Sequence, residues 1–114
     1  MAKAYIPDLG DIVWLQVDPQ AGHKQAACRP AFVVSPRAYN RKVGLALFCP
    51  ITSRIKGYPF EVPLPGSGKA RGAVLSDQLK SLDWRARKAA RFDRAPEEII
   101  LEVTARILAL VDPQ

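Results

Sequence analysis

Two short motifs place an arginine and two hydroxyls at points where the chain changes from loop to regular structure. In "GHKQAACRPAFVVSP" Arg29 stands where a loop of small residues meets an apolar segment, and in "PITSR" Thr52 and Ser53 close another such segment. A guanidinium, which is always charged, and a hydroxyl together suit the binding of a phosphate. A more ordinary interpretation stays open from the residues alone: Arg29 pairs with an acid such as Asp77, and Thr52 caps a turn.

The residue types of the chain argue against a metal-dependent or cofactor-dependent reaction. His23 is the only histidine, so we expect no zinc site, and a lone loop histidine is more often solvated than a general base. The eleven acidic residues are scattered, whereas metal-dependent phosphodiester cleavage needs clustered carboxylates. Residues 66–70, "GSGKA", lack the Ser or Thr and the helix of a phosphate-binding loop, and we predict a hairpin turn there. We therefore expect neither a metal nor a cofactor.

The charge of the chain, +6 over 114 residues, is unevenly distributed. Residues 51–94 hold ten Lys or Arg against four Asp or Glu, whereas residues 95–114 hold one against four. Clustered positive charge favours a polyanionic partner, because binding releases counterions from phosphates, and nucleic acid is the first candidate. The alternative is a solvated basic face that only keeps the protein soluble.

Length and hydropathy predict one soluble domain, residues 1–114. The longest uncharged apolar run, residues 43–53, is shorter than the roughly 18 residues of a membrane span. The N-terminus has no apolar signal region, so we expect a cytoplasmic protein with no membrane partner. The two cysteines are expected as reduced thiols, because 48% of the residues are apolar and the domain needs no disulfide.

Short apolar runs separated by turn residues place these motifs on β-strands. We predict strands at residues 11–18, 30–36, 43–52, 60–64 and 72–78, with a further short strand at 81–84. The first strand is expected to be partly covered on both faces, and Pro63 marks the fourth as an edge strand or a bulge. No helical crossovers separate the runs, so the fold class is mainly β, an antiparallel barrel or a strongly curved sheet.

The C-terminal part follows the rules of a helix. Pro96 stands at a first helical position, and Glu97 and Glu98 follow it, where the helix dipole favours negative charge. The positions 99, 100, 103, 107, 110 and 111 are apolar and share helical spacing, which predicts a helix over residues 96–111 with one face on the sheet. The basic linker, residues 85–94, has one large apolar residue, Phe92, and either a loop or a short helix is expected there.

Four segments together resemble the MazF family of toxin endoribonucleases, also called the MazF/PemK family. They are "YIPDLGDIVW", "DPQAGHKQAACRPAFVVSP", "PITSRIKGYPFEV" and "LSDQLKSLDWRAR". The resemblance implies a small SH3-like antiparallel β-barrel with a C-terminal helix packed on it, as in CcdB and MazF. It also implies a homodimer, an acidic MazE-like antitoxin as partner, and sequence-specific cleavage of single-stranded RNA without a metal.

The resemblance assigns roles to single residues as well. The family's catalytic arginine and threonine fall on Arg29 and Thr52. Gly22 and Gln25 match the family's gating loop, and Asp77 and Gln78 match its base-contacting pair. At position 24 the family commonly has an acid where this chain has a lysine, which leaves the recognised bases open. The implied RNA-binding set is Gly22, Lys24, Gln25, Pro30, Ser53, Arg54, Lys56, Asp77, Gln78 and Ser81.

Without a metal, the simplest nucleophile is the 2′-hydroxyl of the RNA itself, which gives a 2′,3′-cyclic phosphate and a 5′-hydroxyl. Arg29 is then expected to stabilise charge on the phosphorane, and Thr52 to hold a non-bridging oxygen. Single-stranded RNA suits such a site because its splayed bases expose their edges to groups such as Gln78.

Two other functions remain as alternatives, since a fold alone does not fix a function. One is a CcdB-type toxin that binds gyrase and cuts nothing, and the other is a passive RNA-binding module. The presence of both Arg29 and Thr52 favours the nuclease.

Overall fold

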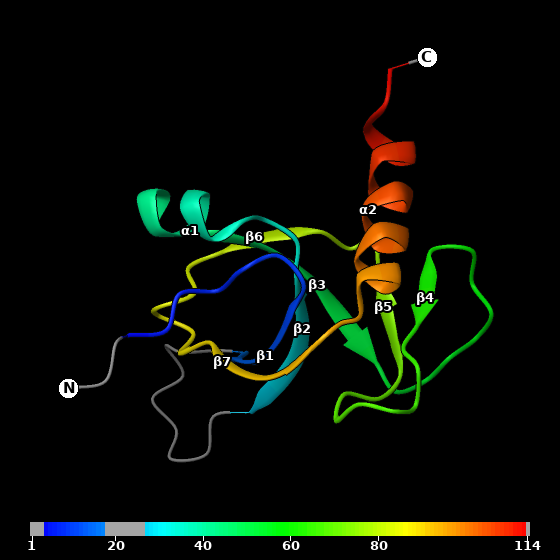
Figure 1. The fold of residues 1–114 in the computed structure, drawn as a ribbon, viewed down its shortest axis with the longest axis horizontal. Coiled ribbons are helices and arrows are strands. Elements are labelled where there is room, and N and C mark those ends of the chain that lie inside the picture. Colours follow the sequence, from blue (N-terminus) through cyan, green and yellow to red (C-terminus); the bar gives the residue numbers. More distant parts are fainter. Residues whose placement is uncertain (1–3, 18–26, 114) are drawn as a thin grey trace.

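A curved antiparallel sheet and two helices make up the fold (Figure 1). The computed structural model describes residues 4–17 and 27–113. Along the chain the elements are β1 (Asp11–Gln16), β2 (Cys28–Val33), α1 (Arg37–Val43), β3 (Ala46–Thr52), β4 (Glu61–Pro63), β5 (Ala73–Leu75), β6 (Lys80–Leu82), β7 (Ala90–Arg94) and α2 (Glu97–Val111). The strand order is β4-β5-β3-β2-β1-β7, and β6 pairs with the start of β3. The mainly β fold class with a C-terminal helix is confirmed.

The predicted strand segments each contain a strand, although the strands are shorter than the apolar runs. The second strand begins at Cys28, two residues earlier than expected. Pro63 lies in β4 at one edge of the sheet, as predicted. Residues 66–70 lie in the turn that joins β4 to its antiparallel partner β5, which confirms the hairpin turn.

The sequence does not predict α1, a helix of seven residues. It has no side-chain cap and no acid in its first turn, and so short a helix is unstable by itself. Contacts from distant segments hold it: the Asn40 amide donates to the carbonyl of Pro7 at 2.8 Å, and the Trp84 indole donates to the carbonyl of Asn40 at 3.1 Å. These partners are far apart in the sequence, so the local pattern does not reveal the helix.

The expectation of a loop or short helix at residues 85–94 is wrong for its second half, which forms β7. This strand pairs antiparallel with β1, with a register shift between Ile12 and Val13. Phe92 stacks on Trp14 of β1 with the ring centroids 4.4 Å apart. A run with one large apolar residue becomes a strand here because β1 supplies both the hydrogen-bonding edge and the aromatic partner.

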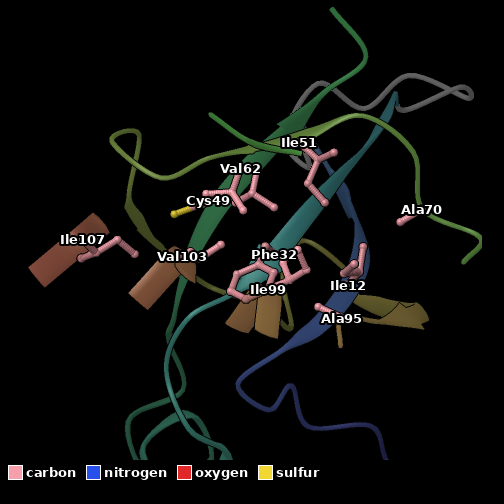
Figure 2. Close-up of a cluster of buried hydrophobic side chains, with 11 residues drawn as sticks. Ile12, Phe32, Cys49, Ile51, Val62, Ala70, Ala95, Ile99, Val103 and Ile107 are labelled. Carbon is pink, nitrogen blue, oxygen red and sulfur yellow. The ribbon is translucent and has the colours of Figure 1, made fainter. Parts of the chain in front are cut away.

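The central strands send alternate side chains to two separate cores, because successive residues of a strand point to opposite faces. The first core contains Ile12, Phe32 and Ile51, and the second contains Val13, Val33 and Phe48. Figure 2 shows the first core, which α2 covers with Ile99, Val103 and Ile107. Partial cover of the first strand on both faces and the packing of the last helix on the sheet are both confirmed.

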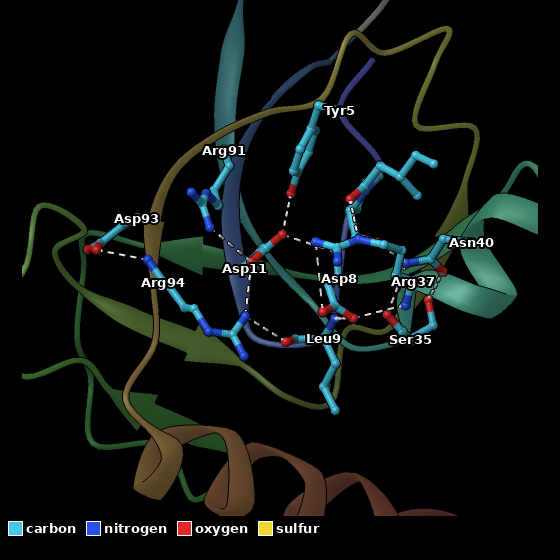
Figure 3. Close-up of polar contacts among 12 residues, drawn as sticks. Tyr5, Asp8, Leu9, Asp11, Ser35, Arg37, Asn40, Arg91, Asp93 and Arg94 are labelled. Atoms are coloured by element: carbon cyan, nitrogen blue, oxygen red, sulfur yellow. Dashed lines mark hydrogen bonds and ion pairs between the residues drawn. The ribbon is translucent and has the colours of Figure 1, made fainter. Parts of the chain in front are cut away.

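A buried carboxylate at the start of β1 joins the N-terminal segment to β7 (Figure 3). Asp11 accepts hydrogen bonds from the Tyr5 hydroxyl at 2.6 Å and the Asp8 N–H at 3.1 Å, and from Arg94 Nη1 at 3.0 Å. Burial of Tyr5, and then its hydrogen bond to Asp11, raise the pKa of this phenol well above its ordinary value. Since a buried polar group without partners is costly, these donors stabilise the buried Asp11 side chain and fix the edge of the sheet.

Both cysteines are free thiols, as expected: Cys28 is exposed and Cys49 is buried. Burial raises the pKa of Cys49 to about 12, and the nearby Asp77 carboxylate adds to the effect. None of the helices within the described ranges has the length and apolar character needed to cross a membrane.

Candidate active site

The second core opens at one end into a cleft, because the strand residues that face it change from apolar to polar. On β2, Val33 and Ala31 are buried whereas Arg29 is exposed. On β3, Phe48 is buried whereas Thr52 is partly exposed. Residues two apart share one face of a strand, so the polar ends of both strands meet at the same surface. The cleft has a volume of about 520 Å³.

The pairing of β2 with β3 brings the predicted catalytic residues together. Ala31 pairs with Pro50 in an antiparallel register. Continuing this register by two residues places Arg29 opposite Thr52, and both line the cleft. The two motifs that the sequence separates therefore meet at one end of one sheet.

The cleft is electropositive. Its lining contains four cationic side chains, which are Arg29, Arg54, Lys80 and Arg87, and no acidic residue of the described segments is among the lining residues. A concave surface lined by one sign of charge attracts the opposite sign. This lining fits the phosphodiester backbone of a nucleic acid.

Close backbone packing holds Thr52 in place. Thr52 pairs with Ala73 of β5. Gly72, which precedes Ala73, approaches Thr52 so closely that a Cβ on Gly72 would lie 2.0 Å from the Thr52 carbonyl oxygen. The Thr52 hydroxyl accepts the Arg54 N–H at 3.1 Å and donates a long bond to the Arg54 carbonyl at 3.5 Å. The turn-capping role is thus observed. It is compatible with phosphate binding, because the weak long bond leaves the hydroxyl proton free to turn to a ligand.

Asp77 is not the partner of Arg29. Its Oδ2 accepts the Tyr58 hydroxyl at 2.5 Å, and this hydrogen bond is the main cause of a raised pKa for Tyr58. Among residues 4–17 and 27–113, no carboxylate forms an ion pair with Arg29. The interpretation of Arg29 as half of an ion pair with Asp77 is therefore wrong.

The cleft gathers part of the predicted RNA-binding set. Besides the catalytic pair it is lined by Pro30, Ser53, Arg54 and Gln78. Lys56, Asp77 and Ser81 are not among its lining residues. Gly22, His23, Lys24 and Gln25 lie outside the described residues.

Sequence reasoning missed three polar residues of the cleft: Gln16, Lys80 and Arg87. Arg87 Nη1 donates to the carbonyls of Gln16 at 3.1 Å and Val17 at 2.6 Å, so it ties the end of β1 to the cleft. For Arg87, the sequence feature that could have revealed its place in the cleft is the basic run at residues 85–94, but this run by itself indicates only a linker. Within the described part of the chain, no three His, Cys, Asp or Glu side chains gather where they would hold a metal ion.

Residues 8–111 match the model of a family described as PemK-like, MazF-like toxins of type II toxin-antitoxin systems. The chain belongs to this family. The match covers the sheet, both helices and every described residue of the cleft. It confirms the resemblance that the four sequence segments indicate.

Individual members of the family are similar over nearly their whole length. Endoribonuclease toxin MazF of Escherichia coli K12 is 47% identical over 112 residues, covering 97% of this chain and 99% of that protein. Endoribonuclease toxin ChpB of the same strain is 40% identical over 119 residues, covering 98% and 100%.

Solved structures agree with the fold. The crystal structure of MazF from Deinococcus radiodurans superposes with a TM-score of 0.85 at 49% identity, covering 96% of this chain and all of that chain (100%). A MazE-MazF crystal structure from the same organism gives a TM-score of 0.88 at 47% identity, with 96% and 100% covered.

Proposed function

We propose that the cleft is where this chain, a MazF-type endoribonuclease toxin, cleaves single-stranded RNA. Family membership and 47% identity to an endoribonuclease toxin support the activity. The observation that carries the site is the meeting of Arg29 and Thr52 in a cleft with four cations and no described acid. A gyrase-binding protein has no need of this pair.

The proposed reaction uses the substrate's own nucleophile. The 2′-oxygen loses its proton to solvent and forms a bond to the adjacent phosphorus, and the bond from phosphorus to the 5′-oxygen breaks. The 5′-oxygen takes up a proton, which leaves a 2′,3′-cyclic phosphate and a 5′-hydroxyl. No imidazole or carboxylate of the described residues lines the cleft, so neither nucleophile finds such a base there. The 2′-hydroxyl is favoured over water because the substrate already holds it beside the phosphorus.

Arg29 and Thr52 have different parts in this reaction. A guanidinium with a pKa above about 12 is a poor base, so we assign to Arg29 the stabilisation of charge on the phosphorane. Thr52 holds a non-bridging oxygen through its hydroxyl. Pro30, Ser53, Arg54 and Gln78, which line the same cleft, hold the nucleotides on either side of the scissile bond.

We further propose two partners besides RNA, on the strength of the family. The MazE-MazF crystal structures of Deinococcus radiodurans support a MazE-like antitoxin as partner. We propose that it is acidic, because negative charge suits a chain of net charge +6. A second copy of the chain is proposed for the outer face of α2, where Leu101, Leu108 and Val111 are exposed. Gly22, Lys24 and Gln25 remain proposed contacts to RNA, and the cytoplasm remains the proposed site of action.

The test is incubation of the purified protein with a long RNA of known sequence in excess chelator. Discrete fragments are expected, because no step needs a metal. Intact RNA would favour the gyrase-binding or passive RNA-binding alternatives. Loss of cleavage on chelation with recovery in magnesium would contradict the metal-free reaction.

A further inference from the structure

The segment between β3 and β4 brings Ser53 and Arg54 to the cleft although residues 53–60 contain neither helix nor strand. Residues 53–59 are all exposed, so burial of side chains does not fix the course of this segment. Its course depends instead on a small number of hydrogen bonds from β4, from the turn after β5, and from Arg106 of α2, whose guanidinium donates to the Pro59 carbonyl.

Glu61 of β4 fixes the middle of the segment. Its carboxylate, with the residue only 7% exposed, accepts the backbone N–H groups of Lys56 at 3.0 Å, Gly57 at 2.9 Å and Tyr58 at 3.2 Å. Gly57 has φ +79°, a left-handed conformation in which successive N–H groups converge on one anion. These donors satisfy a buried charge that is otherwise costly, so Glu61 and the segment stabilise each other.

The turn after β5 fixes the end of the segment. The hydroxyl and the N–H of Ser76 both donate to the Phe60 carbonyl, at 2.6 Å and 3.0 Å. One residue further along the turn, Asp77 accepts the hydroxyl of Tyr58 at 2.5 Å. The next residue is Gln78, which lines the cleft. The Tyr58–Asp77 hydrogen bond therefore joins the segment that carries Arg54 to the turn that carries Gln78.

The surroundings of Asp77 do not suit the reading of a base. Its Oδ2 is occupied by Tyr58, and its Oδ1 is buried without a hydrogen-bond partner among the described residues. Asp77 is not among the residues that line the cleft, whereas its neighbour Gln78 is. Neither carboxylate oxygen is thus presented to the cleft.

We propose that Asp77 is a positioning residue, which through Tyr58 sets Arg54 and Gln78 at their places around the cleft, and that it does not contact a base. This inference rests on the proposed function of the cleft. Arg29 and Thr52 are held by strand pairing with β1 and β5, and the Thr52 hydroxyl is bonded to the Arg54 backbone within the turn that ends β3. The Tyr58–Asp77 bond takes part in none of these contacts. Loss of the Tyr58–Asp77 bond should therefore weaken the binding of RNA without changing the rate of the chemical step.

Tyr58→Phe tests the proposal because it removes one hydroxyl from an exposed side chain. Tyr39→Phe is the matched control, since Tyr39 of α1 is 42% exposed against 46% for Tyr58 and is absent from the cleft lining. The substrate is a single-stranded RNA oligonucleotide that spans a mapped cleavage site. Loss of one hydrogen bond to a charged group predicts a KM about tenfold higher for Tyr58→Phe, with kcat within about twofold of the wild type. Tyr39→Phe should match the wild type.

Two variants of Asp77 separate positioning from base contact. Asp77→Ala should raise KM as Tyr58→Phe does, and the double variant should add nothing further, because both remove the same bond. Asp77→Asn keeps an oxygen for the Tyr58 hydroxyl, so most of the affinity should return and the cleaved sequence should stay the same.

A wild-type KM for Tyr58→Phe, or a changed cleavage sequence for Asp77→Asn, would overturn the proposal. Thermal midpoints, measured in parallel, ensure that folded proteins are compared. Should the wild type leave RNA intact, the proposed function fails instead. The affinity of each variant for a single-stranded RNA oligonucleotide, which then stays uncut, still tests the role of the bond in binding.

Discussion

Arg29 and Thr52 meet in the cleft, but the protein holds them differently. Arg29 stands exposed at the beginning of β2 with no ion pair to a described carboxylate, so its charge is available to a ligand. Thr52 ends β3, where pairing with β5 fixes its backbone and Arg54 orients its hydroxyl. Both side chains can be shortened without opening a core, so their loss tests chemistry and not folding.

Arg29→Ala and Thr52→Ala should each reduce the rate of RNA cleavage by about 10² to 10³, the usual effect of removing one donor to a developing negative charge. The free energy of unfolding should change by no more than about 0.5 kcal/mol for Arg29→Ala, as for other surface substitutions. Single-turnover cleavage and thermal unfolding measure the two effects. Arg41→Ala is the control, because Arg41 is an exposed arginine of α1 outside the cleft lining. Normal cleavage by either variant would assign that residue a structural role only.

At the scale of elements, the position of Thr52 depends on the close approach of the Gly72 backbone to β3. Gly72 has φ +104° and no room for a side chain, since a Cβ would lie 2.0 Å from the Thr52 carbonyl oxygen. Gly44 has φ +82°, but nothing lies within 4 Å of the place its Cβ would occupy. The two glycines thus share a positive φ, which strains any residue with a Cβ, and differ in their neighbours.

Gly44→Ala should lower the free energy of unfolding by about 1–2 kcal/mol, the cost of a left-handed conformation for an L-residue. Gly72→Ala should lower it further, because β3 and β5 must also move apart. At equal concentrations of folded protein, only Gly72→Ala should lose RNA cleavage. Equal unfolding free energies for the two variants would show that the close approach does not matter.

Asp93 of β7 fastens the turn between β4 and β5 to the sheet. Its Oδ2 accepts the Ala70 N–H at 2.8 Å, and its Oδ1 accepts the Arg94 N–H at 2.8 Å. These backbone hydrogen bonds, the bond from Ala70 first, hold the pKa of Asp93 below its ordinary value. A carboxylate with a lower pKa in the folded protein stabilises it fully above about pH 4, and this contribution is lost as the pH falls through the folded pKa.

Asp93→Asn should therefore lower the thermal midpoint near neutral pH and flatten its decline below about pH 4. Thermal unfolding from pH 7 down to about pH 2 measures both effects, within the range where carboxylates titrate. Asp112→Asn, after the exposed end of α2, is the control for the loss of one negative charge. An equally steep decline in Asp93→Asn and the wild type would contradict the role of this carboxylate.

Elements whose own residues carry their pattern were predictable from the sequence, and elements that depend on distant partners were not. The alternating or continuous apolar runs predicted the central strands, and the spacing of Ile99, Val103 and Ile107 predicted α2. The helix α1 depends on Asn40 and Trp84, and β7 depends on the edge of β1. Neither dependence is visible in a local window of sequence.

At the scale of the whole molecule, the candidate site was partly predictable because strand ends gather at one end of a sheet. Arg29 and Thr52 each stand at the end of a predicted strand, and antiparallel pairing brings such ends together. The places of Lys80, Arg87 and Asp77 were not predictable, because they depend on the turn after β5 and on the segment before β7. Sequence patterns specify the strands better than the connections between them.

The cleavage of an RNA oligonucleotide with a single deoxyribose before the scissile bond tests the central claim most directly. The account predicts that the wild-type protein, in chelator, cuts the all-ribose strand into a fragment with a 2′,3′-cyclic phosphate and a fragment with a 5′-hydroxyl. It predicts no cleavage of the deoxy-substituted strand, which should still bind, since one lost hydrogen bond costs only about 1 kcal/mol. A 5′-phosphate on the downstream fragment, identified by mass spectrometry, or cleavage at the deoxyribose would contradict internal attack at the cleft of Arg29 and Thr52.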